Sequence, residues 1–142
     1  MRMNIRPFHI DDQTDLIALW QQVGLATPQN DPGKDIQRKL KVDPELLLVA
    51  TSNGLIIGSV MAGYEGHRGW INYLAVSPFF QRQGVASKLM SRAESELLLK
   101  GCPKINLQVR AANQSVLAFY AALGYLDDNV IGLGKRLTKD RD

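Results

Sequence analysis

The 142-residue chain has very few of the residues that build disulfides or metal sites: one cysteine, Cys102, and two histidines, His9 and His67. A single cysteine excludes an internal disulfide, and the two distant histidines match no metal-ligand spacing, so we expect no metal. A reducing, cytoplasmic location is the simplest interpretation. No apolar run approaches the ~20 residues that cross a bilayer, and the N-terminus lacks a secretory pattern, so we expect no membrane association.

The sequence also has no dense run of positive charge. Its formal net charge of +3 comes from 17 Lys and Arg and 14 Asp and Glu, which are scattered along the chain. Proteins that bind nucleic acid usually carry a basic patch and a recognition motif, and neither is present. With 45% apolar residues the chain is of ordinary globular composition. Its length predicts one domain over residues 1–142.

Hydrophobic periodicity predicts strands and helices in mixed order, which indicates an α/β (α+β) fold with a mixed sheet flanked by helices. We expect strands at 4–7, 45–51, 55–64, 70–76, 105–109 and 130–137. Helices are expected from Asp11 to Gly24, at 35–42, at 85–100, and along the stripe from Val116 to Leu123 that Gly124 ends.

One connection between a predicted strand and a predicted helix has unusual chemistry. The stretch SPFFQRQGVASKLM, residues 77–90, follows an apolar strand and has Gly84 where the next helix begins. A helix start offers unpaired N–H groups and the positive end of the dipole, and glycine lets an anion approach them. Arg82 and Lys88 add positive charge nearby. The alternative is a plain strand-to-helix turn, while the two common phosphate motifs, G-x-x-x-x-G-K-[ST] and G-x-G-x-x-G, are absent.

The same stretch resembles a known family. Gln81-x-x-Gly84-x-Ala86 matches the [QR]-x-x-G-x-[GA] signature of the GNAT family of acyl-CoA-dependent N-acetyltransferases. Upstream, LAVSP at 74–78 is similar to the family's fourth strand and its exit. Downstream, VRAANQSVLAFYAALGY at 109–125 is similar to a second family segment. The resemblance implies a GNAT-like fold, with a central mixed sheet of six or seven strands and about four helices.

The resemblance also implies where acetyl-CoA would bind. The cofactor would lie between strands 70–76 and 105–109, paired through main-chain groups of Leu74 and Val76, with its pyrophosphate on the N–H groups of residues 82–87. Asn113 would reach it through its amide, although its alternative role is a cap before Ser115. The implied cofactor-binding residues are Leu74, Ala75, Val76, Gln81, Arg82, Gln83, Gly84, Val85, Ala86, Ser87 and Asn113.

Tyr120 is the catalytic residue that the resemblance implies. A phenol, with an ordinary pKa near 10, can protonate or hydrogen-bond the thiolate that leaves when an amine attacks the thioester. Its alternative role is structural, because Tyr120 shares a helical stripe with Val116, Phe119 and Leu123, and aromatic residues on such stripes are usually core.

No residue is assigned as the general base. Many relatives place a glutamate on the fourth strand, but residues 70–73, WINY, contain no carboxylate. Asn72 could hold a water, and Glu65 and His67 in the preceding turn are alternatives, although a solvated turn explains both residues equally well.

The predicted function is therefore transfer of an acetyl group from acetyl-CoA to a primary amine of a small molecule, peptide or protein. The alternative is a non-catalytic acyl-CoA-binding sensor or regulatory module. The family commonly shapes its acceptor site from the first two helices, the 26–33 loop and the 65–69 turn. Similar proteins commonly dimerise, so a homodimer is a further expectation.

Overall fold

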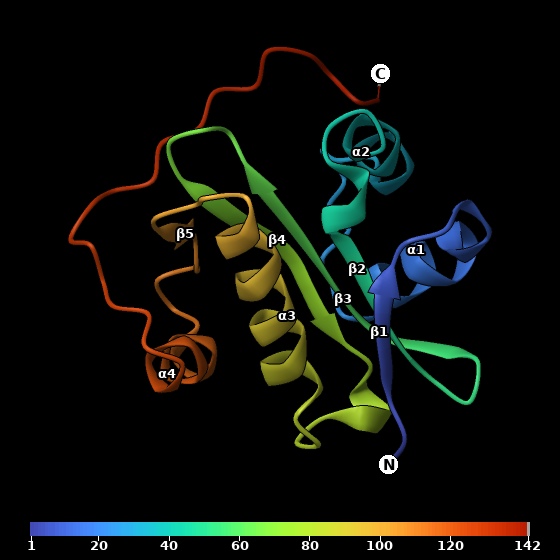
Figure 1. The fold of residues 1–142 in the computed structure, drawn as a ribbon. Coiled ribbons are helices and arrows are strands. Elements are labelled where there is room, and N and C mark those ends of the chain that lie inside the picture. Colours follow the sequence, from blue (N-terminus) through green and yellow to red (C-terminus); the bar gives the residue numbers. More distant parts are fainter. Residues whose placement is uncertain (142) are drawn as a thin grey trace.

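The computed structural model describes residues 1–141, in which five strands form one mixed sheet in the order β1-β2-β3-β4-β5 (Figure 1). Neighbours are antiparallel except β4 and β5, which run parallel. The strands are β1 (Asn4–Pro7), β2 (Leu47–Ser52), β3 (Leu55–Tyr64), β4 (Gly69–Val76) and β5 (Ile105–Leu107). The helices are α1 (Gln13–Gln22), α2 (Pro32–Lys39), α3 (Val85–Leu99) and α4 (Gln114–Ala122), with short 3₁₀ helices at Ile10–Asp12, Pro44–Leu46 and Pro78–Phe80.

The predicted fold class and the four helices are confirmed, but the predicted number of strands, six or seven, is wrong. Residues 130–137 form no strand. The apolar side chains of this segment are 78–90% exposed, and Gly132 and Gly134 interrupt it, which weakens a strand. After α4 the chain instead crosses the molecule toward α2 (Figure 1). There the buried carboxylate of Asp140 forms an ion pair with Arg38 at 2.6 Å.

Two helix boundaries show how local chemistry sets the elements. α2 begins at Pro32, three residues before its predicted start, because the Asp31 side chain accepts a hydrogen bond from the Gly33 N–H at 2.9 Å. Proline at the first helical position also favours this start. α3 begins at Val85, directly after Gly84, as predicted.

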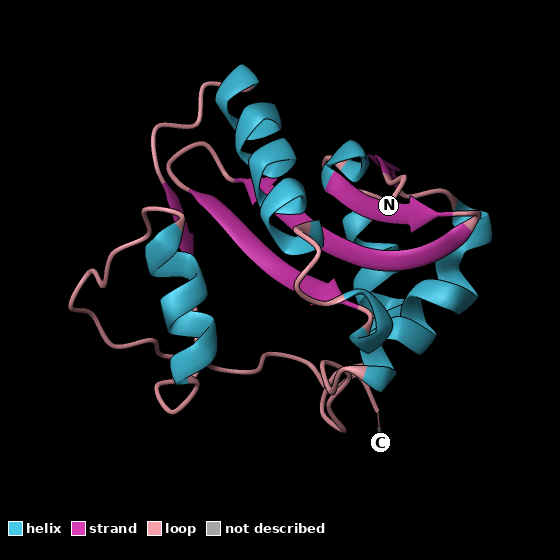
Figure 2. Cartoon of the chain, turned by 90° about the horizontal axis from the view of Figure 1, so that it is seen from below, coloured by secondary structure: helices cyan, strands magenta, loops and turns pink. Residues whose placement is uncertain are grey.

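Each face of the sheet is covered by its own helices (Figure 2). The side chains of a strand alternate between the two faces of the sheet. Successive residues of β2 therefore belong in turn to two hydrophobic clusters, one on each face. Leu48 and Ala50 pack with the buried side of α3, whereas Leu47 and Val49 pack with α1 and with Ile36 of α2.

A β-bulge in β4 interrupts its alternation. Between the pairs Met61–Asn72 and Ser59–Ala75, β3 advances two residues while β4 advances three. The extra residue requires an unusual backbone conformation, and Tyr73 has φ +52°, which is uncommon for a residue with a side chain.

The bulge changes which side chains of β4 face which helices. Ile71 packs in the α3 cluster, but Tyr73 and Ala75 pack in the α1–α2 cluster. In an unbroken strand these three residues would share one face. Asn72 and Tyr73 therefore both lie on the side of α2 although they are adjacent in sequence.

A buried serine holds the bulge in place. The Ser59 hydroxyl donates to the Tyr73 carbonyl at 2.8 Å and accepts a hydrogen bond from the Trp20 indole N–H at 2.9 Å. The Trp20 ring stacks on the Tyr73 ring with their centroids 3.8 Å apart. Ser59 and Trp20 are both 0% exposed, so water cannot replace either bond.

We predict that Ser59→Ala lowers the free energy of unfolding by about 1–3 kcal/mol, because it leaves a buried N–H and a buried carbonyl without a partner. Urea denaturation measures the effect. Ser95→Ala, at an exposed position of α3, is the control and should change little. A Ser59→Ala protein as stable as the wild type would contradict this account of the bulge.

Candidate active site

One side of β4 has an unpaired main-chain edge. β4 and β5 pair only from Gly69–Ile105 to Ile71–Leu107, after which β4 continues to Val76 without a neighbour on that side among residues 1–141. The Ser77 N–H donates to the Ile57 carbonyl on β3 at 2.8 Å. Because main-chain groups alternate in direction, those of Leu74 and Val76 point toward the unpaired side.

The start of α3 lies just beyond this edge and has no side-chain cap. The first intrahelical bond joins the Lys88 N–H to the Gly84 carbonyl at 3.0 Å, so the N–H groups of Val85, Ala86 and Ser87 have no partner within the helix. Gly84 has φ +80°, and a Cβ there would meet nothing within 4 Å. Gly84 therefore leaves open space beside the start of α3, which suits an anion site.

The side chains around this helix start contribute little to the site's shape. Gln81, Arg82, Gln83 and Ser87 are exposed, whereas Val85 is buried under the helix. Arg82 has φ +62°, so the loop makes a second backbone turn of the type that orients successive N–H groups toward an anion.

Asn113 caps α4, as the alternative interpretation of this residue predicted. Its side-chain oxygen accepts a hydrogen bond from the Val116 N–H and another from the Ser115 hydroxyl, both at 3.3 Å. Its amide NH₂ has no partner within residues 1–141, so the cap and a contact to a ligand are compatible. The contact itself stays a prediction.

Tyr120 lies in the core beside α3, and only 8% of it is exposed. Its ring meets those of Phe119 and Tyr125 edge-on at 5.1 and 5.6 Å. The Tyr125 hydroxyl donates to Glu94 at 2.6 Å, but the Tyr120 hydroxyl has no partner in the described part of the chain. Burial raises the pKa of Tyr120 to about 12, so this hydroxyl carries its proton at neutral pH.

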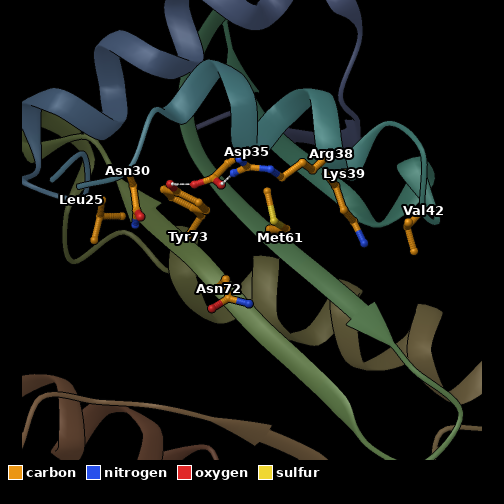
Figure 3. A pocket seen from close by; sticks show the side chains of 9 residues that line it. All are labelled: Leu25, Asn30, Asp35, Arg38, Lys39, Val42, Met61, Asn72 and Tyr73. Carbon is orange, nitrogen blue, oxygen red and sulfur yellow. Dashed lines mark hydrogen bonds and ion pairs between the residues drawn. The ribbon is translucent and has the colours of Figure 1, made fainter. Parts of the chain in front are cut away.

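The other face of β4 borders a cavity of about 570 Å³ beneath α2 (Figure 3). The bulge supplies two neighbouring lining residues, Asn72 and Tyr73. The Tyr73 hydroxyl donates to the Asp35 carboxylate at 2.6 Å, and the Arg38 guanidinium donates to the same carboxylate at 3.0 Å. Burial, and then Asp35, raise the pKa of Tyr73. The lining residues are Leu25, Asn30, Asp35, Arg38, Lys39, Val42, Met61, Asn72 and Tyr73.

Asn72, Glu65 and His67 were the residues considered for removing the proton of the amine. Of these three, only Asn72 lines this cavity. The Glu65 carboxylate holds its own turn together, because it accepts the N–H groups of His67, at 2.7 Å, and of Arg68. His67 is exposed on that turn. Among the residues that line this cavity, Asp35 of α2 is the one carboxylate.

Sequence reasoning missed the charged side chains that α2 brings to the cavity. Lys39 lies three residues after buried Ile36, and this spacing places it on the inward stripe of α2. The spacing was a usable signal for Lys39. No sequence signal indicated the contact between Asp35 and Tyr73, because that contact depends on the bulge.

Comparison with known proteins shows the family. The sequence model of the acetyltransferase (GNAT) family matches residues 11–125. An acetyltransferase of Pectobacterium atrosepticum is 51% identical over 140 residues, and one of Sodalis glossinidius is 48% identical over 141 residues. In both cases the match covers 99% of each chain.

Solved structures share the fold. AAC(6')-Iy, in complex with a bisubstrate analogue, matches with a TM-score of 0.80 at 23% identity, over 96% of this chain and 99% of that one. The NatC complex bound to Gag peptide and CoA matches with a TM-score of 0.76 at 22% identity, over 89% of this chain and 86% of that one.

The family model and the two sequence relatives define an acyltransferase. The chain belongs to the GNAT acetyltransferase family, which uses acyl-CoA donors, so the family predicted from the motifs is confirmed. An enzyme is thereby favoured over a non-catalytic binding module.

No helix in residues 1–141 has both the length and the apolar character needed to cross a membrane. Within those residues, no three His, Cys, Asp or Glu side chains gather into a metal-binding group.

We predict that Gly84→Glu weakens coenzyme A binding by at least about tenfold, because it places a side chain and a negative charge over the α3 N–H groups. Isothermal titration calorimetry measures the affinity. Gly101→Glu is a matched control, since Gly101 follows the opposite end of α3 with φ +86° and equally open space. It imposes similar backbone strain away from the site. Equal affinity of the wild type and Gly84→Glu would contradict the anion site.

Proposed function

We propose that the protein is a cytoplasmic N-acetyltransferase that transfers an acetyl group from acetyl-CoA to a primary amine. The arrangement of β4 carries this proposal. Its unpaired edge and the uncapped start of α3 suit the pantetheine arm and the pyrophosphate of the donor, and its bulged face borders a polar cavity suited to an acceptor. A single strand thus lies between a donor site and an acceptor site.

The reaction is direct attack. The neutral amine nitrogen forms a bond to the thioester carbonyl carbon, the carbon–sulfur bond breaks, and the sulfur leaves as a thiolate. The nitrogen loses one proton to water as the amide forms. Tyr120 donates its proton or a hydrogen bond to that thiolate. Its raised pKa keeps the hydroxyl protonated through the neutral range, although it is a weaker acid than an ordinary tyrosine.

The cofactor-binding roles of Leu74, Val76, the Gln81–Ser87 loop and Asn113 are part of this proposal. Leu74 and Val76 would act through their main chain. Ala75, at 4% exposed, would contribute only by setting the strand between them. The acceptor would be a small-molecule amine or a peptide amine, and the names of the structural relatives include both an aminoglycoside acetyltransferase and a peptide-bound complex.

A panel of amines and peptides, followed by release of free thiol from acetyl-CoA, tests the proposed function. Turnover of at least one primary amine is expected. A protein that binds coenzyme A but acetylates no amine in a broad panel would contradict transfer to an amine.

We predict that Tyr120→Phe lowers kcat by about 10²-fold or more, the usual scale of general acid assistance. Its affinity for coenzyme A should stay within about twofold, because the ring and its packing remain. Steady-state kinetics with an amine identified in the panel give kcat, and calorimetry gives the affinity.

Tyr125→Phe is the matched control for Tyr120→Phe. It removes a hydroxyl from the same aromatic group, but that hydroxyl already donates to Glu94. It should cost stability more than rate. Wild-type kcat in Tyr120→Phe would remove Tyr120 from the mechanism.

The predicted homodimer stays a prediction. The outer edge of β5 has no partner strand in residues 1–141, and such edges invite pairing with another chain. Exposed apolar residues lie in the segment after α4: Leu126, Val130, Ile131, Leu133 and Leu137. Sedimentation velocity should show a dimer, and a monomer at all concentrations tested would contradict it.

A further inference from the structure

Lys39 lines the proposed acceptor cavity with a side chain that is mostly covered. Only 9% of it is exposed, because it lies on the inward stripe of α2 next to Ile36 and Leu40. Figure 3 shows its side chain extending from α2 toward the strands, on the same side of the helix as Asp35.

No acceptor atom within residues 1–141 forms a hydrogen bond or an ion pair with the Lys39 ammonium. Two carboxylates, Asp43 and Glu45, interact electrostatically with Lys39 over a longer distance. Both form ion pairs with the Lys100 ammonium instead, at 3.6 and 2.9 Å. Burial is the largest influence on Lys39 and lowers its pKa, against the opposing effect of those two carboxylates. Lys39 therefore brings to the cavity an ammonium that forms no ion pair within residues 1–141.

The other charges of the cavity are paired with each other. Asp35 accepts hydrogen bonds from Arg38 and Tyr73, and Arg38 also pairs with Asp140 at 2.6 Å. Among the charged lining residues, Lys39 alone forms no ion pair within residues 1–141, so the charge that the cavity can still pair with is negative.

Two charged side chains of α2, Asp35 and Lys39, line the cavity at separate positions. Asp35 and Lys39 are four residues apart on one helix face, about 6 Å along the axis. Asp35 lies at the Asn72–Tyr73 end, beside the strand that borders the donor site, and Lys39 lies further along α2 (Figure 3). An amine placed at β4 therefore leaves an acidic group of the same molecule within reach of Lys39.

We propose that the acceptor is an amine that also carries a carboxylate, and that the Lys39 ammonium binds this carboxylate. This inference rests on the proposed function, since it names the substrate class of the same site. Its chemistry is that of an amino acid or an acidic peptide, with amine and carboxylate several ångströms apart.

Binding of matched ligands tests the inference without any turnover. The ligands are 4-aminobutanoate, 5-aminopentanoate and 6-aminohexanoate, each compared with its primary amide by calorimetry on the coenzyme A complex. We expect at least one carboxylate to bind roughly tenfold or more tightly than its amide, as a charge-assisted hydrogen bond allows.

Lys39→Met should remove this preference and leave the amide's affinity unchanged, because methionine keeps an unbranched apolar chain in the same space. Lys41→Met, at an exposed position just beyond α2, should retain the preference. Thermal unfolding confirms that both variants fold. No carboxylate favoured over its amide, or the same preference in Lys39→Met, would overturn the inference.

The same ligands separate this inference from the proposed function. A carboxylate that binds through Lys39 but is never acetylated supports the anionic site and contradicts the proposed acetyl transfer to it. Acetylation of the amides and carboxylates with equal kcat/KM supports the transferase and overturns the role of Lys39.

Discussion

The hydrogen bonds of the Ser59 hydroxyl, to the Tyr73 carbonyl and from the Trp20 indole, are the contacts on which the site depends. They stabilise a positive φ in the middle of a strand, a conformation that costs free energy wherever a side chain is present. Trp20 joins α1 to the same point by stacking on Tyr73. One buried group thus fixes both the bend of β4 and the position of the helix layer that covers it.

Both halves of the candidate site follow from that bulge. The extra residue turns Tyr73 and Asn72 to one face, where Tyr73 reaches Asp35 of α2. After the bulge, the main-chain groups of Leu74 and Val76 point to the side where β5 has already ended. Without the extra residue, the direction of these groups and the face of Tyr73 would both be reversed. The unpaired edge of β4 and the cavity beneath α2 are therefore coupled through the geometry of one strand.

The sequence predicted the parts of this arrangement that depend on local pattern. Apolar periodicity located the four helices and the strands from β1 to β5, and Gly84 located the start of α3. The strand expected at 130–137 was wrong: its apolar side chains stay exposed, and Gly132 and Gly134 weaken the segment as a strand. The bulge was not predictable either, since it follows from how Ser59 meets Tyr73 across the sheet and from the space that Trp20 fills.

The same distinction explains why the proposed donor site could be predicted from the sequence and the proposed acceptor site could not. A phosphate held by N–H groups needs a glycine and a helix start within a few residues, so its signature is compact in sequence. The acceptor cavity instead combines α2 with the middle of β4, elements separated by a hairpin, and uses side chains such as Asp35 and Lys39 whose spacing resembles that of any amphipathic helix. Under this proposal, acceptor specificity depends on which charges lie on the inward stripe of α2, and these can change without disturbing the unpaired edge of β4 or the fold.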